Sequence, residues 1–166
     1  MAPNQNGFTD AQQSAGFVSL VLVSPFEEDH SALTHLLGET NWNIRWVQTR
    51  QEALDVLRQN RTAVVISECD FPEGNWKDVL RQVQSMTDPP LLIVTSLHAD
   101  NYLWAEVLNL GGYDVLLKPF HASEVVRVVS LAWQRWKNRG ERARTGDLRS
   151  AAGEAGQASR SAGISC

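Results

Sequence analysis

The chain has 166 residues, 43% of them hydrophobic, and a formal net charge of −4 at pH 7. This length fits one domain of roughly 100–200 residues with extra chain at its ends, and no apolar run approaches the roughly 18 residues of a membrane-spanning helix. Two cysteines, Cys69 and Cys166, are too few for a disulfide framework, so we expect a reducing, cytoplasmic environment.

The two ends of the chain differ in composition from its middle. Residues 1–16 have neither a basic start nor an apolar block, which excludes a signal peptide and predicts a flexible leader. Residues 137–166 contain six basic and three acidic residues, a net charge of +3, which leaves −7 for residues 1–136. Because nucleic-acid binding usually shows a clustered basic face, this distribution predicts no nucleic-acid partner.

Between these ends, apolar runs alternate with helical patterns. The first run ends at Ser24-Pro25, and acids then mark a helix start, where they suit the positive end of the helix dipole. Gly38 is expected to end this first helix, and Thr49 with Glu52 forms a capping box that begins the second. In chain order, the predicted strands are 17–23, 43–47, 63–67, 91–94 and 115–117, and the predicted helices begin near 27, 50, 75, 101 and 122.

This alternation predicts a parallel sheet with helices on both faces. The strand at 43–47 is shorter and more polar than the others, so we place it at an edge of the sheet. The last helix is expected to end near Trp136, because the following residues lack large apolar side chains. We therefore divide the chain into a leader (1–16), a folded domain (17–138) and a disordered low-complexity tail (139–166).

Three groups of residues at strand ends indicate a family. Lys118-Pro119-Phe120 follows the fifth strand, Thr95 ends the fourth, and Pro72 and Gly74 follow the third. With these residues the sequence resembles the receiver domain of two-component response regulators. The resemblance implies a flavodoxin-like, doubly wound (βα)5 fold, a three-layer sandwich with a parallel sheet in the order 2-1-3-4-5.

The resemblance also implies roles for particular positions. Receivers take a phosphoryl group on an Asp at the tip of the third strand, and a pair of acids after the first strand helps that Asp to hold Mg²⁺. A hydroxyl residue, an aromatic residue and a lysine complete the switch. The corresponding positions here are Glu68 for the acceptor, Ser24 and Pro25 for the acidic pair, Thr95 for the hydroxyl, Val115 for the aromatic residue and Lys118 for the lysine.

Three of these positions depart from the family pattern in ways that matter chemically. Ser24 and Pro25 supply no carboxylate, so Mg²⁺ binding is expected to be lost or weak and we expect no cofactor. Glu68 moves the attacking oxygen by about 1 Å, a shift that can cost about 100-fold in rate. We therefore expect an atypical receiver, not an enzyme, in which Glu68 pairs with Lys118 and fixes the domain in one state. The alternative is a working receiver with a displaced acidic site formed by Asp70 with Glu27 or Glu28.

Three side chains are candidates for a partner-binding face: Trp104, Val126 and Trp133. In the receiver family, the face made by the fourth helix, the fifth strand and the last helix serves dimerisation or output. We therefore expect a stand-alone bacterial signalling protein that contacts a histidine kinase, an output protein or a second copy of itself. A flavodoxin-like module that binds a small ligand is a third interpretation, although the sequence has no loop that would cradle a phosphate.

Overall fold

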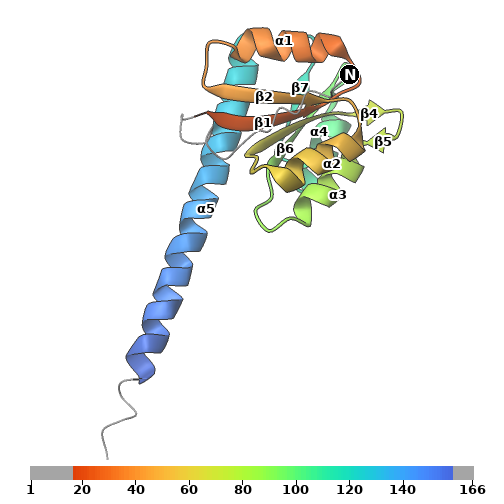
Figure 1. Cartoon of the computed structure of the whole chain (residues 1–166). Helices are drawn as coiled ribbons and strands as arrows, with labels where there is room; N and C mark the ends of the chain where they lie inside the picture. Colours follow the sequence, from red (N-terminus) through yellow and green to blue (C-terminus); the bar gives the residue numbers. More distant parts are fainter. Residues whose placement is uncertain (1–16, 159–166) are drawn as a thin grey trace, which may run out of the picture.

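The computed structural model describes residues 17–158, and the surroundings of side chains through residue 150 (Figure 1). The predicted leader, 1–16, and the last residues, 159–166, lie outside this part. Five parallel strands form the sheet in the order β2-β1-β3-β6-β7, which is the predicted order 2-1-3-4-5 with β2 at an edge. Their bounds are β1 Val18–Val23, β2 Trp42–Val47, β3 Val64–Glu68, β6 Leu91–Ser96 and β7 Asp114–Leu117.

Helices cover both faces of the sheet, and one small hairpin lies beside it (Figure 1). The hairpin pairs β4, Asp70–Phe71, with β5, Gly74–Asn75, where the sequence predicted only a turn. The helices are α1 Glu27–Leu37, α2 Arg50–Gln59, α3 Trp76–Gln84, α4 Asn101–Leu110 and α5 Ala122–Ala158. The architecture is the parallel sheet between helices that the alternating pattern predicts, in the flavodoxin-like arrangement that the resemblance implies.

The central strands are buried on both faces because successive side chains point to opposite sides. In β1, Leu20 and Leu22 belong to the core cluster that includes α1 and α5, whereas Val21 and Val23 belong to the cluster that includes α2 and α3. All four side chains are fully buried. The continuous apolar runs of the sequence therefore correspond to a parallel sheet covered by two helical layers.

The helix ends show where local rules hold and where they do not. Thr49 Oγ1 accepts a hydrogen bond from the Glu52 backbone N–H at 3.2 Å, as predicted, but Glu52 Oε2 accepts from the Gln48 N–H rather than from Thr49. Gly38 ends α1 with a right-handed φ of −64°, so the left-handed cap that glycine would favour is not formed there. Gly111 adopts that conformation instead, with φ of 98°, at the end of α4.

Helix α5 is much longer than predicted. It continues to Ala158, and its last residues project away from the domain (Figure 1). This finding corrects the disordered tail for residues 139–158. The tail lacks core-forming side chains, but its Ala, Arg and Glu residues have high intrinsic helix propensity and extend a helix already nucleated on the domain. We call residues 137–158 the arm.

Candidate functional site

Four predicted site residues meet at the carboxyl edge of the sheet. Ser24 directly follows β1, Glu68 ends β3, Thr95 lies near the end of β6, and Lys118 directly follows β7. Register places Glu68 opposite Thr95, because β3 and β6 pair in parallel. Strands that are far apart in sequence thus deliver these side chains to one place, the edge where open α/β sheets bind ligands.

The Lys118 ammonium group lies between two carboxylates. It donates to Glu68 Oε2 in a short ion pair, so the predicted contact between these two residues is present. It also donates to Asp29 Oδ1 at 3.2 Å and to Asp29 Oδ2 at 3.1 Å. An ammonium group has three donors, and three carboxylate oxygens surround this one. The lysine at this position is therefore fully engaged by the protein itself.

Two hydroxyl groups complete the cluster. Ser24 Oγ donates to Asp29 Oδ2 at 2.6 Å and accepts from the Phe26 N–H at 3.1 Å. Thr95 Oγ1 donates to Glu68 Oε2 at 3.2 Å, which turns the predicted switch hydroxyl toward the acceptor position. Ser24 and Thr95 are fully buried. We call Ser24, Asp29, Glu68, Thr95 and Lys118 the lysine cluster.

The lysine cluster is largely shielded from water. The side chains of Asp29, Glu68 and Lys118 are 7%, 9% and 9% exposed. The Phe26 ring lies over the ammonium group, with Lys118 Nζ 4.9 Å from the ring centroid, and is itself 46% exposed. At this distance the ring attracts the cation and limits its access to solvent.

Two carboxylates compete for one cation, and this competition sets the protonation of the cluster. Burial raises the pKa of Glu68, and the negative charge of Asp29 raises it further, against the lowering effect of the hydrogen bond and charge of Lys118. Burial alone would lower the pKa of Lys118, but its hydrogen bonds to Glu68 and Asp29 outweigh this effect and raise it. Lys118 therefore stays protonated at neutral pH.

The raised pKa of Glu68 predicts a pH-dependent effect of Glu68→Gln. A carboxyl whose pKa is higher in the folded state stabilises the fold below its unfolded pKa, near 4.5, and loses that contribution as the pH rises through the folded pKa. Glutamine does not titrate, so the free energy of unfolding of the native protein should fall relative to that of Glu68→Gln as the pH rises from about 4.5. Urea unfolding of both proteins across this range measures the difference; a constant difference would contradict the raised pKa.

Sequence reasoning missed Asp29 as a member of the cluster. Asp29 was grouped with Glu27 and Glu28 as an acidic helix start, yet only Asp29 is buried, whereas the other two are exposed. The signal available in the sequence was position: in the first turn of α1, the third acid is the one on the side that carries the buried Leu33 and Leu37. The helix turns this acid toward the sheet edge.

The acids of the alternative interpretation lie outside the buried cluster. Asp70 is exposed in the β4–β5 hairpin, and Glu27 and Glu28 are exposed on α1. Within residues 17–158, no group of three or more His, Cys, Asp or Glu side chains has a metal-binding arrangement.

Next to Glu68, burial raises the pKa of the Cys69 thiol to about 11, with Asp70 and Glu68 adding to the effect.

The residues predicted to form a partner face do not share one surface. Trp104, on α4, is 50% exposed and donates to Asp114 Oδ1 of β7 at 3.0 Å. Trp133 instead packs on the core cluster of α1 and α5, where its ring meets Trp42 edge-on at 6.3 Å. Val126 packs against the same core cluster and is half-buried.

Val115, which occupies the position of the switch aromatic residue, is buried.

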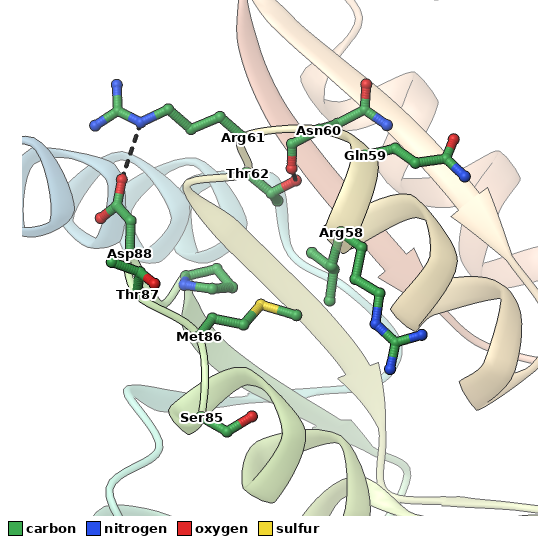
Figure 2. Close-up of a pocket in the computed structure, with 11 residues that line it drawn as sticks. Arg58, Gln59, Asn60, Arg61, Thr62, Ser85, Met86, Thr87 and Asp88 are labelled. Atoms are coloured by element: carbon green, nitrogen blue, oxygen red, sulfur yellow. Dashed lines mark hydrogen bonds and ion pairs between the residues drawn. The ribbon is translucent and has the colours of Figure 1, made fainter.

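A hollow lies at the opposite end of α2 and α3 from the lysine cluster. Figure 2 shows this hollow, whose volume is about 420 Å³. The end of α2 and the segments that follow α2 and α3 line it, and the Arg61–Asp88 ion pair lies at its border. Arg61 Nε lies 2.9 Å from Asp88 Oδ2, and both side chains are well exposed. No acid–base cluster faces this hollow, so the chemistry of the site belongs to the carboxyl edge.

Comparison with known proteins places the chain in a family. The family model described as response regulator receiver domain matches residues 27–130, more than half of the chain. The chain belongs to the response regulator receiver domain family. The receiver domain matched here includes the strands and helices that carry Asp29, Glu68, Thr95 and Lys118.

Curated relatives share this receiver domain at low identity. The transcriptional regulatory protein FixJ of Bradyrhizobium diazoefficiens is 28% identical over 102 residues, which is 61% of this chain and 49% of FixJ. The transcriptional regulatory protein LytR of Staphylococcus aureus is 26% identical over 100 residues, 59% of this chain and 40% of LytR. The chain thus spans half or less of the length of these two relatives.

Solved structures confirm the fold of the receiver domain. The signal receiver domain of an HD domain-containing protein from Pseudomonas fluorescens has a TM-score of 0.69 and 22% identity, covering 76% of this chain and 93% of that one. A response regulator from Thermotoga maritima has a TM-score of 0.65 and 20% identity, and the match covers 71% of this chain and 98% of that one. None of the helices in the described receiver is long and apolar enough to cross a bilayer.

Proposed function

We propose that this receiver is a phosphate-independent member of the family that signals by protein–protein contact in one fixed state. The observation that carries the proposal is the Lys118 ammonium group held between the buried carboxylates of Glu68 and Asp29. Its partners are a histidine kinase or an output protein of the two-component type, its location is the bacterial cytoplasm, and it has no catalytic activity of its own.

The electrostatics of the lysine cluster support this proposal. An incoming phosphoryl group is strongly anionic, and its transfer depends on positioning and on neutralising the developing charge. Here the group would meet the carboxylates of Glu68 and Asp29, while the one cation is already paired with both. The positions of the acidic pair hold Ser24 and Pro25, which offer Mg²⁺ no carboxylate.

The state in which the domain is fixed follows from Thr95. Its hydroxyl donates to Glu68 and is fully buried, so it points into the cluster without any phosphoryl group. Glu68 thereby fills the space between Thr95 and Lys118 that the resemblance assigns to a phosphoryl group. We infer that Glu68 substitutes for the modified acceptor rather than receiving the modification.

Incubation with acetyl phosphate and Mg²⁺, followed by intact-mass measurement, tests the proposal. The native protein should show no phosphoryl adduct under conditions in which a matched variant, Ser24→Asp/Pro25→Asp/Glu68→Asp, restores all three acids and gains one. Circular dichroism verifies that the variant is folded. A stable adduct on native Glu68 or Asp70 would overturn the proposal, and Asp70→Asn would distinguish the two residues.

A further inference from the structure

Four arginines of α5, at the root of the arm and along it, share one face of the helix. Arg135, Arg142 and Arg149 recur every seven residues, which is about two helical turns, so their side chains project from the same side of α5. Arg139 lies one turn beyond Arg135 on this side. All four side chains are exposed. We call these four residues the arginine face.

Contacts at the root of the arm fix the orientation of the arginine face. The Arg135 guanidinium lies 6.0 Å from the ring centroid of Tyr113, and Arg139 Nη2 donates to the Pro89 carbonyl. Further along, Arg142 and Arg149 enter none of the ion pairs found within residues 17–150. The outer half of the arginine face is therefore available to an external anion.

A polar hollow lies between the two outer arginines. Gly146, at its centre, has no atom within 4 Å of the position that a Cβ would take. Arg142 and Arg149 line the hollow together with Asn138, Thr145 and Glu141, so one carboxylate lies among its polar groups. The residues of the arginine face and those between them on the same side include no carboxylate.

The arm also holds these cations away from the acidic body of the protein. Residues 1–136 carry a net charge of −7, but at 1.5 Å per residue Arg149 lies about 20 Å along the helix from Trp136. This exceeds the Debye length of about 8 Å at physiological ionic strength, so the repulsion of the body is screened. The sequence-based exclusion of nucleic acid rested on the lack of a clustered basic face, and the helix creates such a face.

We propose that the arginine face of the arm binds the phosphate backbone of double-stranded nucleic acid. An α-helix fits the major groove of B-DNA, which is about 12 Å wide, and arginine pairs bidentately with phosphate. Glycines at 140, 146, 153 and 156 each weaken an isolated helix by about 1 kcal/mol. A bound polyanion would neutralise the clustered charge and so stabilise the helical arm.

Fluorescence anisotropy of a short mixed-sequence DNA duplex, titrated with the full chain over a series of salt concentrations, tests the proposal. Arg142→Ala/Arg149→Ala should weaken binding and reduce the salt slope, log K against log salt concentration, by about 2, one unit per lost phosphate contact. Lys137→Ala/Arg144→Ala removes the same charge from the other side of the arm and should leave the slope nearly unchanged.

Each other outcome overturns the proposal. If the two double variants lose duplex affinity equally, the duplex is attracted to the net charge of the arm rather than to the arginine face. If the duplex does not bind at low salt, the arginine face is not a nucleic-acid site. The same conclusion follows if vesicles of anionic lipid bind and the duplex does not.

Discussion

Replacing Lys118 with methionine is expected to lower the free energy of unfolding by about 3–5 kcal/mol, the usual cost of removing one partner from a buried ion pair. Lys118 is the cation that separates Asp29 from Glu68, and all three side chains are at most 9% exposed. Methionine keeps most of the side-chain volume, so the loss comes from charge. Urea unfolding at neutral pH measures it.

Acidification and a matched ion pair provide the controls for Lys118→Met. As the pH falls through the raised pKa of Glu68, the cost should shrink because a neutral Glu68 no longer repels Asp29. Lys77→Met breaks the exposed pair with Glu106, whose side chains are 40% and 45% exposed, and should cost about 0–1 kcal/mol. Similar losses for both variants would show that the lysine cluster contributes no more than a surface ion pair.

The sequence predicted the lysine cluster in part because strand ends are easy to locate. Continuous apolar runs fix where each buried strand stops, and parallel strands all stop at the same edge, so Glu68, Thr95 and Lys118 could be brought together without coordinates. Asp29 could not be placed in this way. Its burial follows from helical spacing instead, because Asp29 lies four and eight residues before the buried Leu33 and Leu37.

The contacts of Trp133 could not be predicted from the sequence for a related reason. Trp133 is a candidate for the partner-binding face in the sequence, but β2 begins with Trp42, and the two rings meet. Helical periodicity describes one helix and not the side chain opposite it. The length of α5 was missed because the sequence argument weighed the absence of core residues after Trp136 and not the intrinsic helix propensity of the arm.

Trp136 joins the domain to the arm, and Trp136→Ala should lower the free energy of unfolding by about 3–5 kcal/mol. The side chain is 8% exposed in the core cluster of α1 and α5, and the Arg61 guanidinium covers its ring at 4.4 Å. Removing it opens a cavity and releases Arg61. Because α5 is one continuous helix, we also expect the arm to lose helix, which circular dichroism at a temperature below unfolding would detect.

Trp136→Phe separates packing from hydrogen bonding at this junction. Within the described part of the chain, the indole N–H of Trp136 is buried without a hydrogen-bond partner, and such a group costs about 1–3 kcal/mol. Phenylalanine removes that donor while keeping an aromatic ring under Arg61, so Trp136→Phe should be destabilised far less than Trp136→Ala. Thermal and urea unfolding measure the loss of stability in each variant. Equal losses in Trp136→Phe and Trp136→Ala would mean that the full indole surface, rather than an aromatic ring of any kind, holds the arm to the domain.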